Sequence, residues 1–237
     1  MCTNGGANAV AVAEHAIMLM LAVYRKLIAY HANVAAGRWH QGLPRAADVF
    51  ELAGKRVGLI GLGQIGEQVA RRLRAFEARV LYYDPVRRAT AEERRLGVEY
   101  LPLEALLESA DIVSLHVPLN AATRGLIDAR ALARMKPKAV LINTSRGAVV
   151  EEEALVAALQ QGRLLGAGLD TLAQEPPDPG HPLLKLPNVV LTPHSAGPTV
   201  ESFDKRFRNG YANIERVAAG LPPRWVIPEM RDLFPAS

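Results

Sequence analysis

A glycine-rich turn between a short apolar run and a helical stretch constrains the fold of this chain more than any other feature. Gly61, Gly63 and Gly66 form the pattern G-x-G-x-x-G directly after the apolar run of residues 56–60. The first glycine permits a tight turn, the second lets the backbone approach a pyrophosphate, and the third lets the following helix pack closely on the strand. This context favours a dinucleotide-binding unit over a glycine turn that serves packing alone.

The apolar runs that follow set the rest of the architecture. They lack polar alternation, which is typical of strands buried on both faces of a parallel sheet. Strands are therefore predicted over residues 56–60, 78–83, 111–116, 139–143, 165–169 and 188–192, and helical segments over residues 64–76, 103–108, 129–134 and 151–160. This alternation predicts an α/β fold, a Rossmann-type doubly wound parallel sheet with helices on both faces.

Two helices are expected outside this alternation. Apolar residues at three- and four-residue steps predict one amphipathic helix over residues 9–28. A long helix with mixed faces is predicted over residues 200–219, followed by a proline-rich tail from Leu221. With 237 residues in all, we expect a single domain over residues 1–237.

Composition and charge exclude several classes of protein. Hydrophobic residues make up 49% and charged residues 22%, which rules out a disordered or fibrous chain. The single cysteine, Cys2, can form neither an internal disulfide nor a zinc cluster, so the cytoplasm is the expected compartment. Although the net charge is +4, the basic residues are scattered, and we expect no nucleic-acid partner. The apolar stretch 16–24 is far shorter than the ~20 residues of a membrane span, so we expect no membrane partner.

An acidic residue indicates which dinucleotide is bound. Asp84 lies at the end of the second predicted strand, where a carboxylate can accept hydrogen bonds from both hydroxyls of an adenosine ribose. This position favours NAD, because the 2′-phosphate of NADP would meet a negative side chain. Arg87 and Arg88 are close enough to leave some tolerance of NADP open. The alternative is that Asp84 is a solvated strand end.

Polar segments follow three later strands, where the carboxyl ends of an open parallel sheet form the ligand crevice. These segments are residues 143–150, 170–177 and 192–197. Together with the glycine turn, Asp84 and the segment 115–119, they resemble the D-isomer-specific 2-hydroxyacid dehydrogenases. The resemblance runs from about Asn8 to about Val226. It implies an NAD-dependent oxidoreductase that interconverts a small 2-oxo acid and its (R)-2-hydroxy acid.

The resemblance also implies three catalytic residues. Arg146 would hold the 2-oxo acid, because its guanidinium fork can engage carboxylate and ketone oxygens and polarise the carbonyl. His194 would donate a proton to the carbonyl oxygen and take it back in the reverse reaction. Glu175 would bind the other ring nitrogen of His194 and favour the imidazolium.

The cofactor contacts are implied in the same way, with Asp170 reaching toward the nicotinamide end unless it is only a strand-end turn residue. The implied set is Gly61, Gly63, Gln64, Ile65, Gly66, Asp84, Val117, Pro118, Thr144, Ser145, Arg146, Asp170, His194, Ala196 and Gly197. His116 could line the same pocket, while His15, His31, His40 and His181 fit structural or solvated positions. Asp170, Glu175 and His194 could form a metal site by ligand type, but the resemblance implies no metal.

Expectations about partners follow from the family as well. Residues 1–50 correspond to its dimer-forming helix and loop, and so apolar a helix needs a covering surface, so we expect a homodimer. Burial of that helix on its own sheet is the alternative. Family members normally begin with a substrate-binding domain of roughly one hundred residues, which residues 200–237 would contact. This sequence opens after that point. A late-starting gene model, a fragment that works with another chain and a degenerate protein are the possible reasons.

Two functions therefore remain open at the level of sequence. The first is turnover of a 2-oxo acid, with glyoxylate, hydroxypyruvate, pyruvate and 3-phosphoglycerate all compatible with the chemistry. The second is an NAD(H)-sensing dimerisation module without turnover, similar to the corepressors of this family. No residue of the sequence selects one of these substrates.

Overall fold

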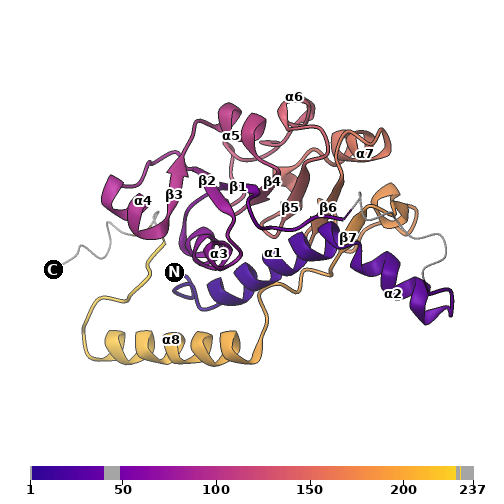
Figure 1. The fold of residues 1–237 in the computed structure, drawn as a ribbon. Helices are drawn as coiled ribbons and strands as arrows, with labels where there is room; N and C mark the ends of the chain where they lie inside the picture. The colour runs from indigo at the N-terminus through magenta and orange to yellow at the C-terminus, as the bar shows by residue number, and fades with distance from the viewer. Residues whose placement is uncertain (1, 40–48, 228–229, 231–237) are drawn as a thin grey trace.

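The computed structural model describes residues 2–39, 49–227 and 230, and these form a seven-stranded parallel sheet between two layers of helices (Figure 1). The strands lie in the order β3-β2-β1-β4-β5-β6-β7, and every neighbouring pair is parallel. Their bounds are β1 Arg56–Ile60, β2 Arg79–Tyr83, β3 Val98–Tyr100, β4 Ile112–Leu115, β5 Val140–Asn143, β6 Gly166–Leu169 and β7 Val189–Leu191. The predicted Rossmann-type fold is confirmed, and its strand order reverses between β1 and β4, where such sheets bind ligands.

Helices cover both faces of the sheet. In Figure 1, α1 (Ala9–Tyr24) and α3 (Gln64–Ala75) lie on one face, and α5 (Leu103–Ser109), α6 (Ala129–Arg134) and α7 (Glu152–Gln160) lie on the other. Successive strand residues point to opposite faces, so Leu59 belongs to one apolar cluster and Ile60 to the other. Both side chains are completely buried. This is why the strands read as continuous apolar runs in the sequence.

Two elements of the first half were not predicted. These are α4 (Thr90–Leu96) and the edge strand β3. The helix has only seven residues and ends at Gly97, whose φ of 68° lies in the left-handed region that glycine adopts without strain. The strand has three residues, too few for an apolar run to stand out.

The predicted helix over residues 9–28 is wrong in its extent. The helix α1 ends at Tyr24, and Lys26 adopts a φ of 52° before a separate helix, α2 (Leu27–Ala35), begins in another direction. Neither glycine nor proline marks this break. The ring of Tyr24 packs against the ring of Phe50 at 5.5 Å between centroids, so tertiary packing holds the last turn of α1.

The apolar surface of α1 is buried in the chain's own core. Ala13, Ala16, Leu19 and Met20 have no exposed surface, and the helix packs on β5, β6 and α3. The argument that this helix needs a second subunit to cover it is therefore wrong. In contrast, α2 exposes apolar side chains to solvent, at Leu27, Ile28 and Val34. Residues 40–48 of the expected dimer-forming loop lie outside the described residues.

The long C-terminal helix is confirmed as α8 (Val200–Ala218). Thr199 and Ser202 form a reciprocal capping box at its N-terminus. The helix lies apart from the sheet in Figure 1, and it exposes a stripe of large apolar side chains at Val200, Phe203, Phe207, Tyr211, Ile214 and Val217. In the parts of the chain that the structure describes, none of the helices has the length and apolar character needed to cross a membrane.

Candidate active site

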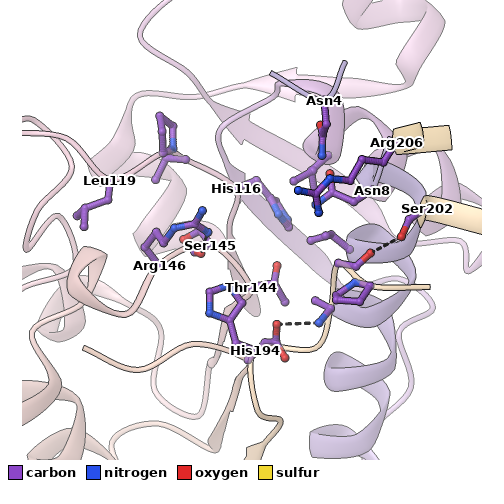
Figure 2. Close-up of a pocket in the computed structure, with 18 of the residues that line it drawn as sticks. Asn4, Asn8, His116, Leu119, Thr144, Ser145, Arg146, His194, Ser202 and Arg206 are labelled. Atoms are coloured by element: carbon purple, nitrogen blue, oxygen red, sulfur yellow. Dashed lines mark hydrogen bonds between the residues drawn. The ribbon is translucent and has the colours of Figure 1, made fainter. Parts of the chain in front are cut away.

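A pocket of about 740 Å³ opens at the carboxyl ends of the central strands, within the size range of small-ligand sites (Figure 2). The turns after β4, β5, β6 and β7 form one side of it, and the N-terminal segment and α8 form the other. Ten of the predicted site residues line it, namely Ile65, Val117, Pro118, Thr144, Ser145, Arg146, Asp170, His194, Ala196 and Gly197. The topology of the sheet thus brings these ten predicted site residues, from positions 65 to 197 of the sequence, to one pocket.

The glycine turn lies at the end of β1 and has the shape that a pyrophosphate needs. A Cβ atom at Gly66 would lie 2.3 Å from the carbonyl oxygen of Gly61, whereas one at Gly63 would meet nothing within 4 Å. The helix α3 starts after Gly63 without a side-chain cap, so the N–H groups of its first turn can bind an anion. Buried Thr144 Oγ1 also has no hydrogen-bond partner among the described residues. These features fit a dinucleotide.

Asp84 is half-buried beside this turn rather than simply solvated. Its Oδ2 accepts a hydrogen bond from the Leu62 N–H at 3.0 Å, and its Oδ1 accepts one from the Val86 N–H at 3.1 Å. Since a carboxylate has about four acceptor positions, two remain for ribose hydroxyls. Asp84 thus fixes the glycine turn against the end of β2 while keeping capacity for a ligand.

Arg87 and Arg88, the two arginines that could allow NADP to bind, both have partners within the chain. Arg87 forms an ion pair with Glu93 at 2.9 Å. Arg88 donates to the Leu62 carbonyl at 2.7 Å and lies 3.4 Å from Glu67. A 2′-phosphate would have to compete with these carboxylates for the guanidinium groups.

His194 lines the pocket and forms a close pair with Glu175, which lines the neighbouring cavity and not the pocket itself. His194 Nδ1 lies 2.7 Å from Glu175 Oε2, and the Leu172 N–H donates to Glu175 Oε1 at 3.0 Å. Burial would raise the pKa of Glu175, but these hydrogen bonds outweigh it and hold the pKa below its ordinary value. The carboxylate is therefore ionised at neutral pH. Because Nδ1 is engaged, Nε2 is the ring atom available for proton transfer.

Arg146 lies on the same side of the pocket as His194 (Figure 2). Its Nη1 donates to the Ser145 carbonyl at 2.7 Å, which ties one nitrogen of the guanidinium to its own turn. The turn is shaped by Asn143, whose side chain donates to the Arg146 carbonyl at 2.9 Å and accepts from the Ser145 N–H at 2.9 Å. The other donors of the exposed guanidinium are directed at the cavity by this arrangement.

Asp170 is almost fully buried, with 1% of its surface exposed. Its carboxylate accepts hydrogen bonds from the N–H groups of Ser195 and Ala196, both at 2.9 Å, and from the Thr192 hydroxyl at 2.6 Å. His15, on α1, lies 2.8 Å from that hydroxyl. His15 was expected at a structural or solvated position, and its contact with Thr192 is structural; that the two residues bear on Asp170 was not predicted, although a histidine within so apolar a helix is a signal for a buried polar contact.

The other histidines are placed as follows. His31 is exposed on α2, His181 lies 3.3 Å from Glu152, and His40 is outside the described residues. His116 lines the pocket, and its Nε2 lies 3.0 Å from Ser114 Oγ. Within residues 2–39, 49–227 and 230, no group of three or more histidine, cysteine or acidic side chains could hold a metal ion.

His116 leads to a testable pH dependence of stability. Burial lowers the pKa of its imidazole from 6.5 to about 4. The unfolded chain takes up a proton here below its ordinary pKa, whereas the folded chain does so only near pH 4, so the free energy of unfolding is expected to fall as the pH drops through this window. The whole effect is at most about 3 kcal/mol.

Urea unfolding of the wild type and of His116→Gln at several pH values between 7 and 4 measures this contribution. The variant is expected to lose less stability on acidification than the wild type. The exposed histidine of α2, changed in His31→Gln, is the matched control and is expected to follow the wild type. Parallel curves for wild type and His116→Gln would contradict the assignment.

Known proteins place the chain in a family. The family described as D-isomer specific 2-hydroxyacid dehydrogenase, NAD binding domain, matches residues 17–196. The chain belongs to this family. A glyoxylate reductase of Korarchaeum cryptofilum is 43% identical over 228 residues, which cover 94% of this chain and 68% of that protein. A hydroxypyruvate reductase of Thermotoga maritima is 41% identical over 214 residues, covering 90% and 67%.

The solved structures agree with this assignment. A D-lactate dehydrogenase with NAD+ from Lactobacillus jensenii superposes with a TM-score of 0.82 at 33% identity, covering 92% of this chain and 68% of that one. The expected family, the NAD cofactor and the class of activity are thereby confirmed: the chain is an NAD-dependent oxidoreductase of D-2-hydroxy acids. It spans about two thirds of the length of these relatives.

Proposed function

We propose that this protein reduces a small 2-oxo acid, with Arg146, Glu175 and His194 as the catalytic residues. Glyoxylate would give glycolate, which has no stereocentre, and hydroxypyruvate would give its (R)-2-hydroxy acid. The observation that supports this proposal most strongly is that His194, which lies 2.7 Å from Glu175, lines the same pocket as Arg146. The names of the relatives from Korarchaeum and Thermotoga supply the two substrates.

Each catalytic group has one task in this proposal. Arg146 binds the carboxylate and carbonyl oxygens of the 2-oxo acid and polarises the carbonyl. His194 Nε2 donates a proton to the carbonyl oxygen, and Glu175 stabilises the imidazolium that is present before the transfer. When bound, NADH supplies the hydride. In the reverse direction His194 accepts the proton from the hydroxyl.

The cofactor would be held along the carboxyl ends of the strands. Gly61, Gly63, Gln64, Ile65 and Gly66 offer the turn and helix N-terminus for the pyrophosphate, and Asp84 offers acceptors for the ribose. The residues expected near the nicotinamide end are those that line the pocket, namely Val117, Pro118, Thr144, Ser145, Asp170, Ala196 and Gly197. Asp170 Oδ2 accepts from Ala196, which leaves it a second acceptor position for a ligand.

Replacing Asp84 with alanine tests the ribose contact. The variant is expected to bind NADH about tenfold more weakly, because one charged hydrogen-bond acceptor contributes roughly 1.5–3 kcal/mol and part of that is recovered by water. Fluorescence titration with NADH measures the dissociation constant. Asp178→Ala is the matched control, since Asp178 also accepts from a backbone N–H, that of Gly180, whereas Asp84 accepts from the Leu62 N–H in the glycine turn. Equal affinities of wild type and Asp84→Ala would refute the ribose role.

We also propose a homodimer that uses α2. Leu27 and Ile28, which are more than half exposed, and Val34 form an apolar surface that the other described residues leave uncovered. Ile28→Glu is expected to lower the sedimentation coefficient from that of a dimer to that of a monomer. A wild-type chain that sediments as a monomer at all concentrations contradicts the proposal.

The single cysteine supports a cytoplasmic location.

The chain is proposed to be one cofactor domain over residues 1–237 whose C-terminal part, residues 200–237, contacts a substrate-binding domain. The apolar stripe of α8 supports this, because six large side chains on one face of a helix need a covering surface. Adding a substrate-binding domain of the family is expected to slow amide hydrogen exchange in α8. Unchanged exchange would contradict the contact.

Turnover tests the main proposal directly. NADH is mixed with the protein and with glyoxylate or hydroxypyruvate, and the absorbance of NADH is followed. We expect a decrease that depends on protein and 2-oxo acid together. Binding of NADH without turnover of any 2-oxo acid would contradict the proposal and favour an NAD(H)-sensing module.

A further inference from the structure

The loop that carries His194 is held in an unfavourable conformation. His194 has a φ of 53°, in the left-handed region that costs a residue other than glycine on the order of 1–3 kcal/mol. The His194 N–H donates to the Asp170 carbonyl at 2.8 Å, and the next two N–H groups, of Ser195 and Ala196, donate to the Asp170 carboxylate. The orientation of the imidazole therefore depends on where Asp170 is fixed.

Asp170 is fixed in turn by a contact from the other end of the chain. Thr192 Oγ1 lies 2.6 Å from Asp170 Oδ1, and His15 Nε2 lies 2.8 Å from Thr192 Oγ1 and 3.4 Å from Asp170 Oδ1. His15 is on α1, whose backbone is anchored in the core, and its side chain is only 14% exposed. The contact joins residues 177 positions apart.

The chemistry fixes the direction of these hydrogen bonds. A carboxylate only accepts, so Thr192 must give its single hydroxyl proton to Asp170. The hydroxyl oxygen then accepts from His15, which must carry a proton on Nε2. Without His15 the Thr192 hydroxyl oxygen would lose its donor, and the hydroxyl would be held less firmly in the orientation that serves Asp170. Because a buried carboxylate depends on its donors, this would loosen the position of Asp170.

We propose that His15 is a positioning residue for the catalytic loop, acting on His194 through Thr192 and Asp170. This inference rests on the proposed role of His194 as the proton donor. His15 does not touch the substrate or the reacting atoms. Its effect is to keep the imidazole aligned with the carbonyl, and a displacement of about 1 Å at such a site can lower turnover by as much as a hundredfold.

Two substitutions at one position test this proposal. His15→Leu fills a similar volume without a donor, whereas His15→Gln places an amide N–H near the position of Nε2. We expect His15→Leu to lower kcat by ten- to a hundredfold while the NADH dissociation constant changes less than about threefold. His15→Gln is expected to recover most of kcat. His181→Leu, at a histidine that does not line the pocket, is the matched control.

A second measurement does not depend on turnover. Amide hydrogen exchange at Ser195 and Ala196 is expected to accelerate in His15→Leu and in Thr192→Val, and the double variant is expected to show no additive effect, because both changes break one chain of contacts. Should His15→Leu fail to fold, Thr192→Val carries the same test.

The outcomes separate this inference from the proposed function. Wild-type protein that binds NADH but shows no turnover contradicts the proposed function, and the exchange rates then still decide the role of His15. Normal turnover in His15→Leu, equal damage in His15→Gln and His15→Leu, or unchanged exchange at Ser195 and Ala196 would overturn the positioning role alone.

Discussion

Replacing His194 with glutamine is expected to lower kcat for reduction of a 2-oxo acid by roughly 10²–10⁴, the usual contribution of a positioned general acid. Glutamine has no proton to transfer near neutral pH, and it lacks the Nδ1 donor that lies 2.7 Å from Glu175 Oε2. Steady-state kinetics with NADH and glyoxylate measure the loss. The NADH dissociation constant and the thermal midpoint are expected to stay close to those of the wild type.

The chain offers a matched control for this variant. His181 also faces a carboxylate, with its Nε2 3.3 Å from Glu152, but it does not line the pocket. His181→Gln is therefore expected to leave kcat unchanged. If His194→Gln retains kcat, or if it loses NADH binding to the same degree as turnover, His194 is a structural histidine and not the acid.

Replacing Arg146 with glutamine is expected to lower kcat/KM by on the order of 10²–10³, as for loss of a group that stabilises the developing negative charge on the carbonyl oxygen. Arg146→Lys keeps the charge but loses the planar guanidinium, so its kcat/KM is expected to lie between that of Arg146→Gln and that of the wild type. The exposed guanidinium is the positively charged group beside His194 that the 2-oxo acid would meet.

Arg130, an exposed arginine on α6 away from the pocket, supplies the control. Arg130→Gln is expected to behave as wild type in the same assay. An Arg146→Gln variant with unchanged kcat/KM would show that the substrate is held elsewhere, and the pocket's other arginine, Arg206, would be the next group to replace.

The strands of the fold were predictable because they are buried on both faces. In Arg56–Ile60 the last four residues are buried, with Leu59 facing one apolar cluster and Ile60 the other, so these four positions exclude polar side chains. Elements without such a pattern were missed. The edge strand Val98–Tyr100 is short, and the break at Lys26 has no glycine or proline to mark it.

The candidate site was predictable to a similar degree. The glycine turn is local, so its spacing in the sequence indicates its shape. The family pattern of their segments is the basis on which Arg146, Glu175 and His194 were predicted as catalytic residues. The pairing of Asp84 with the Leu62 and Val86 N–H groups, at the end of β2, was not visible in the sequence. It arises because β1 and β2 are neighbours in the sheet.

The sequence by itself determined the strands, most of the helices, the glycine turn and the types of side chain at the strand ends, since these depend on residues close together in the chain. Only the tertiary structure decided that α1 is buried on its own sheet and that His15 contacts Thr192 across 177 positions. The physical reason is that periodicity and turn geometry depend on neighbouring residues. A contact between residues far apart in the sequence depends instead on the spatial order of the strands in the sheet and on how the helices pack against it.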